Sequence, residues 1–491
     1  MVAKRVIVIG AGFAGLSAAS FMAKYGWQVT LLEKHNQPGG RARQLQVNNF
    51  TFDMGPSWYW MPQVFERYFE QFNAKVTDFY ELIRLDPSYI VHWHNYKLAI
   101  PANYEALLAA FESIEPGSSA QLTKFLEEAA YKYEVGINKL VHKPGLSITE
   151  FIDWDVIKGV IRLDVFTNMK AHVAKYFKDV RLQQLMEFPV LFLGAMAEQI
   201  PALYSLMNYA DVKLGTWYPK HGMYQIVKAM EQVAKQQGVT IHYNQAVLSI
   251  NVHNGVAASV TTANEVYTAD AVIAAADYNH VEQYLLQPQW QSYSKAYWNK
   301  KLLAPSCLLY YVGLSKRLSN PIHHQLFFDA DFGKHAAEIY TSKQWPTNPL
   351  FYVSTTTATD VSGAPEGCEN LFFLIPIAAG LSGDTEAQRT HYFELILQRF
   401  EQKIGESIKD NIIAYQSYGL ANFESDYGAY KGNAYGLANT LLQTAILKPK
   451  CKSKKVKNLY YSGQLTVPGP GVPPSLISGE LVAKLVHNEL S

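Results

Sequence analysis

Three glycines and one acid near the N-terminus have the residue types and the spacing of a dinucleotide site. Gly10, Gly12 and Gly15 form the pattern G-x-G-x-x-G, with Ala14 inside it, and Glu33 lies further along the chain. In such a pattern the first glycine makes a tight turn, the second lets a pyrophosphate approach the backbone, and the third lets a helix pack on a strand. An acid placed like Glu33 can accept a hydrogen bond from a ribose hydroxyl.

The segments around these residues predict the strand, helix and strand that would position them. Residues 6–9 are an unbroken apolar run, which is typical of a buried parallel strand. Residues 16–25 predict a helix that ends at Gly26, and residues 29–32 predict a second strand that ends at Glu33. An acid there favours a ribose without a 2′-phosphate, and so FAD or NAD rather than NADP. A glycine-bearing unit without any ligand is the alternative.

A second glycine-rich turn helps to choose between these cofactors. Gly39, Gly40, Arg41 and Arg43 follow directly after the second strand. Arginines at such a turn suit a longer pyrophosphate-containing cofactor that extends past the first site, whereas a solvated basic turn is the alternative reading. No second G-x-G-x-x-G follows a strand elsewhere, so we expect one bound dinucleotide that carries the redox chemistry itself.

The end of the chain repeats the order of strand, loop and helix. Residues 459–461 predict a strand, a loop dense in glycine and proline follows, and Pro473 and Pro474 suit a helix start because their missing N–H groups cost nothing there. The free amides of that helix would face something electron-rich. A surface turn before a packing helix is the alternative.

The middle of the chain predicts a cofactor domain that is broken by insertions. An amphipathic helix precedes strand-like runs, Asn254–Gly255 predicts a two-residue hairpin turn, and the apolar run 271–276 can return to the parallel sheet. We therefore expect an α/β fold with a discontinuous, Rossmann-like FAD-binding domain over residues 1–95, 216–285 and 456–491. The insertions are a helical substrate and membrane subdomain, 96–215, and a substrate-binding mixed-sheet domain, 286–455.

Composition excludes several classes of function. The net charge of +1 gives no global field for nucleic acid, and the three cysteines are too far apart for a disulfide framework or a thiolate metal site. No apolar run is long enough to span a membrane, and the first strand leaves no room for a signal peptide. The 14 histidines show no ligand spacing, and His323–His324 favours a loop pair over a metal site. We expect no metal and no catalytic side chain.

The chain resembles the bacterial phytoene desaturase family of carotenoid desaturases, within the larger amine-oxidase-like FAD superfamily. The resemblance is carried by the N-terminal fingerprint, "PGGRAR", "DMGPS", "PALYSLMNYADVKLGTWYPKHGMYQIVKAM" and "LYYSGQLTVPGPGVPPSLISG". It implies FAD, a peripheral (monotopic) position on the cytoplasmic face of a membrane, and a long apolar tunnel for a polyene. The FAD contacts that it implies are Gly10, Gly12, Ala14, Gly15, Glu33, Gly40, Arg41, Gly55, Ser57, Val247, Gly463, Gln464, Val472 and Pro473.

The resemblance implies that a C40 carotene such as phytoene loses a hydride from an allylic CH₂–CH₂ unit to flavin N5, with a quinone or O₂ as the final electron acceptor. Many relatives have a histidine where this chain has Val467, which removes one candidate for proton transfer. Three alternatives stay open. They are a desaturase of a later step (hydroxy-carotenoid or γ-carotene type), an FAD amine oxidase, and a non-enzymatic prenyl-binding escort protein.

Two segments bear on membrane contact. Residues 188–207 are mostly apolar but interrupted by Pro189, Glu198 and Pro201, so they could dip into a bilayer or line the core. Six lysines between Lys448 and Lys457 could meet anionic headgroups or form a solvated loop.

Overall fold

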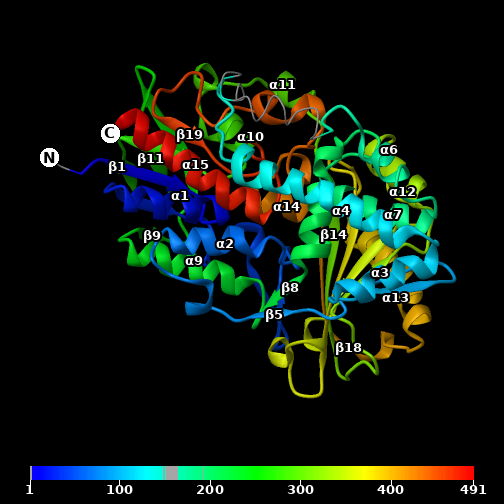
Figure 1. Ribbon diagram of the computed structural model, residues 1–491. Helices are drawn as coiled ribbons and strands as arrows, with labels where there is room; N and C mark the ends of the chain where they lie inside the picture. Colours follow the sequence, from blue (N-terminus) through cyan, green and yellow to red (C-terminus); the bar gives the residue numbers. More distant parts are fainter. Residues whose placement is uncertain (1–2, 148–149, 151–163, 192) are drawn as a thin grey trace.

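The computed structural model describes residues 3–147, 150, 164–191 and 193–491, and places two large sheets side by side (Figure 1). Part of the predicted helical region, residues 148–149 and 151–163, and residue 192 of the apolar segment lie outside the described residues.

The first sheet is parallel and has five strands in the order β19-β13-β1-β2-β9. Its strands come from three distant segments of the chain, and each pairs with its neighbour in parallel register. This confirms the predicted return of the chain to one parallel sheet. The bounds of the strands are β1 Arg5–Ile9, β2 Gln28–Leu32, β9 Thr240–His242, β13 Ala271–Ala274 and β19 Leu459–Tyr461.

Helices α1 (Phe13–Lys24) and α15 (Val472–Leu490) lie side by side against this sheet, at the end where both termini of the chain meet (Figure 1). The Ser17 hydroxyl donates to the Leu476 carbonyl at 2.8 Å. A Cβ added at Gly479 would lie 2.3 Å from the Ala14 carbonyl oxygen, so the two helix backbones are in direct contact. The end of the chain therefore completes the packing that its beginning starts.

A small antiparallel sheet follows the amphipathic helix α9 (Tyr224–Gln236). Its strands are β10 (Val247–His253), β11 (Val256–Thr262) and β12 (Val266–Thr268). Asn254 and Gly255 connect the first two with φ angles of 51° and 75°, as a type I′ turn requires, which confirms the predicted hairpin.

The second large sheet is mixed and has seven strands in the order β18-β14-β17-β16-β15-β6-β7. Its longest strands, β14 and β17, pair along their whole length, and every residue of β14 is buried. β6 lies within residues 1–95 but pairs with β15 of this sheet. The bounds are β6 Tyr89–His92, β7 Lys97–Ile100, β14 Ser306–Leu314, β15 His324–Phe327, β16 Phe351–Ser354, β17 Glu369–Ile377 and β18 Ile412–Tyr418.

Each face of the mixed sheet is covered. On one face, helices α4 (Ser118–Val135), α6 (Met169–Ala174) and α7 (Val180–Leu191) share an apolar core with the sheet. On the other face, Phe393 and Phe400 of α13 (Glu386–Ile404) pack on Phe373.

Shorter elements connect these layers. The strands are β3 Gln44–Val47 and β4 Phe50–Asp53, which form a hairpin, and the pair β5 Leu82–Arg84 with β8 Trp217–Pro219. The helices are α2 Pro62–Glu70, α3 Tyr104–Ile114, α8 Leu206–Tyr209, α10 Tyr278–His280, α11 Lys295–Asn299, α12 Phe332–Tyr340 and α14 Leu420–Tyr427.

Of the two segments singled out for membrane contact, residues 188–207 are largely buried, whereas the lysine segment keeps Lys454, Lys455 and Lys457 exposed. Phe188, Val190 and Ile200 belong to the core between helices and mixed sheet. The expectation of one solvated lysine cluster is wrong for Lys448, which is 2% exposed and donates to Asn439 Oδ1 at 2.7 Å. Lys450 donates to the Gly145 carbonyl instead of facing solvent alone. Within the described residues, no helix is long and apolar enough to cross a membrane.

Candidate cofactor site

The first glycine turn is built so that only glycine fits at two positions. Gly10 follows β1 with a φ of +98°, in the left-handed region, and its N–H donates to the Leu32 carbonyl at 2.8 Å. A Cβ added at Gly15 would lie 1.8 Å from the Gly10 carbonyl oxygen. Helix α1 therefore begins in direct contact with the turn, as the third glycine of the fingerprint predicts.

The two glycine turns face one another. A Cβ added at Gly40 would lie 3.3 Å from the Gly12 Cα, and one added at Gly12 would lie 3.9 Å from the Gly40 Cα. The Gly39 N–H donates to the Ala11 carbonyl at 2.8 Å, which holds the turns together. The result is a cradle of bare backbone at the N-terminus of α1, where amides and helix dipole favour an anion.

Glu33 lies at the end of β2 and is 4% exposed. Its carboxylate accepts from the Ala11 N–H at 2.7 Å and from the His35 N–H at 2.9 Å, so it is held beside the first turn. The Gln245 N–H donates to the Glu33 carbonyl at 2.8 Å, and Val247 begins β10 directly afterwards. Val247 therefore follows a segment that is bonded to the Glu33 backbone, and its adenine contact stays a prediction.

The two arginines of the second turn are not solvated, so the alternative reading of a basic surface turn is wrong. Arg43 is 8% exposed and pairs with Asp426 at 2.5 Å. The Arg41 guanidinium lies over the Tyr427 ring at 5.1 Å and donates to the Asn433 carbonyl at 3.2 Å. Burial lowers the pKa of Arg41, while Asp277 opposes that shift. The Arg41 Nε is buried without a hydrogen-bond partner among the described residues.

Gly55 and Ser57 connect the second turn to the mixed sheet. A Cβ added at Gly55 would lie 2.6 Å from the Arg41 carbonyl oxygen, so this segment packs on the turn. The Tyr311 hydroxyl of β14 donates to the Met54 carbonyl at 2.6 Å. Ser57 then lines a cavity of about 260 Å³.

The C-terminal loop folds back onto its own helix. The Gly463 N–H donates to the Ser478 hydroxyl at 3.0 Å, and that hydroxyl donates to the Val467 carbonyl at 2.8 Å. A Cβ added at Gly463, whose φ is +111°, would lie 3.9 Å from the Ala14 Cβ. Gln464 Nε2 donates to Asn433 Oδ1 at 3.1 Å. Asn433 therefore joins the loop to Arg41.

Val472 and Pro473 are the first residues of α15. Gly471 precedes them with a φ of +111°. A branched side chain would be strained at that angle, so this position favours glycine.

The residues present fit FAD. The acid Glu33, which accepts hydrogen bonds, lies at one end, the bare cradle of Gly12 and Gly40 lies in the middle, and the half-buried Arg41 lies beyond it. Arg41 Nε, Gln245 Oε1 and Ser462 Oγ are buried polar atoms without a hydrogen-bond partner in the described residues, and such atoms usually have one. No sequence motif pointed to Asn433, Tyr427 or Ser478, which the structure places at this site. Only the glycine-rich run around Asn433 could have drawn attention to that residue.

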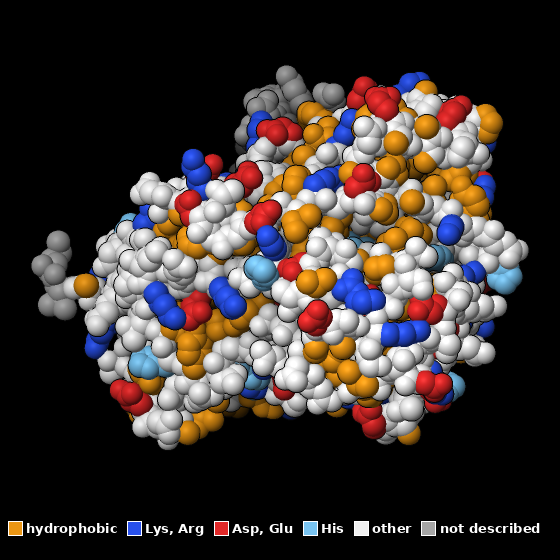
Figure 2. Space-filling view, turned by 90° about the horizontal axis from the view of Figure 1, so that it is seen from below, with side chains coloured by type: hydrophobic (Ala, Val, Ile, Leu, Met, Phe, Trp, Pro, Cys, Tyr) orange, Lys and Arg blue, Asp and Glu red, His pale blue; other side chains and the backbone are white. Residues whose placement is uncertain are grey.

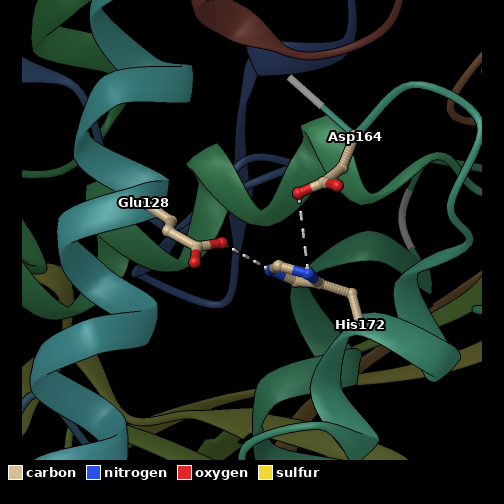
Figure 3. Close-up of side chains that lie close together, drawn as sticks. All are labelled: Glu128, Asp164 and His172. Atoms are coloured by element: carbon tan, nitrogen blue, oxygen red, sulfur yellow. Dashed lines mark ion pairs between the residues drawn. The ribbon is translucent and has the colours of Figure 1, made fainter. Parts of the chain in front are cut away.

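One cluster of possible metal ligands lies away from this site. Glu128 of α4, His172 of α6 and Asp164, in the turn before α6, converge (Figure 3). His172 Nε2 lies 3.9 Å from the Glu128 carboxylate, and His172 Nδ1 lies 3.8 Å from the Asp164 carboxylate. Lys132 Nζ lies 3.0 Å from Asp164 and already supplies a cation. Burial and Lys132 lower the pKa of His172 to about 4. His172 and Lys132 are buried whereas Glu128 is exposed, so the cluster is a partly exposed group centred on the Lys132–Asp164 ion pair.

Comparisons with known proteins identify the family of the chain. Residues 13–487 match the family of flavin-containing amine oxidoreductases. A carotenoid 3,4-desaturase of Haloarcula japonica is 36% identical over 99% of this chain and 98% of its own length. A zeta-carotene-forming phytoene desaturase of Myxococcus xanthus is 30% identical over 98% of this chain and 93% of its own.

The fold also matches solved structures. An oxidoreductase from Methanosarcina mazei has a TM-score of 0.64 at 16% identity and covers 98% of this chain and 100% of its own. Sequence and site together show that the chain belongs to the carotenoid desaturases, FAD-dependent oxidoreductases within the flavin-containing amine oxidoreductase family.

Proposed function

We propose that this desaturase dehydrogenates a CH₂–CH₂ unit next to the conjugated system of a C40 carotene such as phytoene, in carotenoid biosynthesis. The observation that carries the proposal is the apolar core that begins where the cofactor site ends. Tyr311 touches the Met54 backbone and lies on the same sheet face as Leu309 and Leu374. Helices α4, α6 and α7 cover this face, so a long apolar molecule could bind between helices and sheet.

The chemistry suits a site without a strong base. A carbanion at an unactivated CH₂ has no group to stabilise it, whereas loss of a hydride leaves an allylic cation that the polyene delocalises. Loss of a proton from the neighbouring carbon then forms the new double bond. Bound FAD would supply the two-electron acceptor, and a quinone or O₂ would reoxidise it. The chain itself binds the polyene, orients it and excludes water.

The cofactor contacts are part of the proposal. We assign Glu33 and Val247 to the adenosine side, and the backbone of Gly12 and Gly40 to the pyrophosphate. The C-terminal loop and the start of α15 then lie beside the redox ring. The strand pairing supports an FAD-binding domain formed by residues 1–95, 216–285 and 456–491, with β6 contributed to the mixed-sheet domain.

Membrane association is also proposed. Four leucines, Leu302, Leu441, Leu442 and Leu447, are exposed, and Gln443 ties their segments together by accepting from the Leu302 N–H at 3.0 Å. Thr444, among them, lies 3.4 Å from the Tyr204 hydroxyl of the apolar segment 188–207. On the face that Figure 2 shows, hydrophobic, basic and acidic side chains are interspersed. Net positive charge on that face therefore gives no reason for binding to an anionic bilayer. The leucines would enter the bilayer and admit the substrate.

Two rivals have less support. An amine oxidase would need a site that recognises a soluble amine, and the likeness to putrescine oxidase, at 12% identity, shows the fold alone. A prenyl-binding escort protein needs no flavin, which leaves the cradle of Gly12 and Gly40 without a purpose.

The test is conversion of phytoene in liposomes by the purified yellow protein, followed by chromatography of the products. We expect new double bonds and, without oxygen, bleaching of the flavin absorbance. Addition of a quinone or O₂ should restore the absorbance and identify the acceptor. Peroxide release with amines and no change in any carotene would overturn the proposal. A Leu442→Ser variant should bind liposomes less, whereas Leu248→Ser, an exposed leucine on β10, is the matched control.

A further inference from the structure

A lysine is buried behind the C-terminal loop without a counter-charge. Lys448 is 2% exposed, and its ammonium group donates to Asn439 Oδ1 at 2.7 Å. Among the described residues, no carboxylate pairs with this ammonium, and the charged group that acts on it is Lys301, a second cation. A buried charge costs much free energy unless it is paired. The site therefore suits an anion that the described side chains do not provide.

The ammonium group lies in contact with the backbone of that loop. A Cβ added at Gly469 would lie 3.1 Å from Lys448 Nζ and 3.0 Å from Asn439 Oδ1. The Thr466 hydroxyl, from the same loop, donates to the carbonyl of Pro449 at 2.7 Å and so holds the residue after Lys448. The position of the charge relative to the loop is therefore fixed from two sides.

The position of Lys448 decides which anion could benefit from its charge. Because the side chain is buried, a lipid headgroup at the surface cannot pair with it. Gly469 lies three residues before Val472, the first residue of α15, whose N-terminal amides also favour negative charge. The charge of Lys448 and the start of α15 thus act on the same end of the loop.

We infer that Lys448 is a positioning residue whose buried positive charge favours the reduced form of the bound flavin. The inference rests on the proposed function, in which this loop lies beside the redox ring, and deepens it. Hydride transfer breaks a C–H bond of the polyene, and the hydrogen leaves with both bonding electrons. The flavin thereby gains one negative charge. A cation held behind the loop stabilises that charge more than it stabilises the neutral, oxidised ring.

The electrostatics of Lys448 make this effect depend on pH. Burial and, as the smaller cause, Lys301 lower the pKa of Lys448 to about 7 from its ordinary 10.5. The neighbours in contact with the ammonium, Asn439 and the Gly469 backbone, do not titrate. Lys448 is therefore mostly charged at pH 6 and mostly neutral at pH 8. Reduction of the flavin raises the pKa of Lys448 in turn, because the coupling between the two charges is reciprocal.

The experiment measures the midpoint potential of the flavin in the purified holoprotein, by reduction alongside an indicator dye, at pH 6 and pH 8. In Lys448→Met protein at pH 6, the ratio of reduced to oxidised flavin at a fixed potential should fall about tenfold, a shift of about 30 mV. At pH 8 the fall should be about twofold, because little of the wild-type lysine is charged there. Lys448→Arg keeps the charge and should keep the wild-type potential at pH 6. Lys455→Met, the same change at an exposed lysine, should leave the potential unchanged.

A second variant covers the case in which Lys448→Met protein does not fold. Asn439→Asp is nearly the same size and sets a carboxylate on the ammonium, which cancels its charge, so the ratio at pH 6 should fall as in Lys448→Met. An unchanged potential at pH 6 in either folded variant, or an equal change in Lys455→Met, would overturn the inference. The measurement contains no polyene. It therefore decides the inference even if the wild type desaturates no carotene and the proposed function fails.

Discussion

The two halves of the molecule build their sites from different parts of the chain. The site at the parallel sheet is made of backbone. Its positions Gly10, Gly12, Gly15 and Gly40 carry no side chain, and an added Cβ at each would approach other backbone atoms. The mixed sheet presents side chains, with Tyr311, Tyr352 and Phe372 on one continuous face. A site made of backbone tolerates no added atoms, whereas a site made of side chains can change its ligand by substitution. We therefore expect variants of the first half to lose cofactor and variants of the second to alter specificity.

The largest effect should come from removing residues 459–491, which takes both β19 and α15 from the parallel sheet. The loss exposes the side of β13 that pairs with β19 and the side of α1 that packs on α15. We expect no folded, flavin-bound protein, as measured by circular dichroism and flavin absorbance. A chain shortened by Ser491 alone is the control. A truncated protein that purifies yellow would contradict the prediction.

The next largest effect should come from Gly15→Ala, and it should differ from the effect of Gly12→Ala in the same motif. Gly15→Ala puts a Cβ 1.8 Å from the Gly10 carbonyl oxygen and must move α1, so it should lower the melting temperature and flavin content together. A Cβ added at Gly12 would meet only the Gly40 Cα, at 3.9 Å. The Gly12→Ala protein should therefore fold normally and lose only its FAD. Thermal unfolding and flavin content of both variants test this. Equal loss of stability in the two would show that Gly12 serves packing and not the pyrophosphate.

A moderate effect is expected at Glu33. Glu33→Ala removes the ribose acceptor and leaves the Ala11 and His35 amides without their partner. FAD affinity should fall by about 1–3 kcal/mol, the cost of an unpaired buried polar group. The measurement is titration of the apoprotein with FAD, with the exposed Glu265→Ala as control. Unchanged affinity would mean that Glu33 supports only the turn.

The smallest effect is a pH dependence in the substrate half. Burial raises the pKa of Asp211 to about 7 from its ordinary 3.8, although the Tyr89 hydroxyl donates to it at 2.7 Å. Between these two pH values the folded state holds a proton that the unfolded chain releases, so this group's contribution to stability falls as pH rises. In urea unfolding, the stability of the wild type relative to Asp211→Asn should therefore fall from pH 4 to pH 7, because the asparagine does not titrate. A constant difference would contradict the shift.

Much of the cofactor half could be predicted because its signals are local. Short apolar runs predict the strands β1, β2, β13 and β19, and two residues, Asn254 and Gly255, predict the hairpin turn. The environment of the lysines near the C-terminus could not be predicted in this way. The residue type of Lys448 predicts a surface position, yet its ammonium group donates to Asn439 in the interior.

The sequence by itself determined the cofactor class, because glycine spacing and the acid at position 33 act through backbone geometry within one strand–helix–strand unit. The family followed from motifs spread along the whole chain. Only the tertiary structure decided which distant residues meet. It joined Arg41 to Gln464 through Asn433, and it set Trp58 of the N-terminal segment on His324 of the mixed sheet. Such contacts depend on how the sheets and helices pack, and residue spacing along the chain carries no information about that packing.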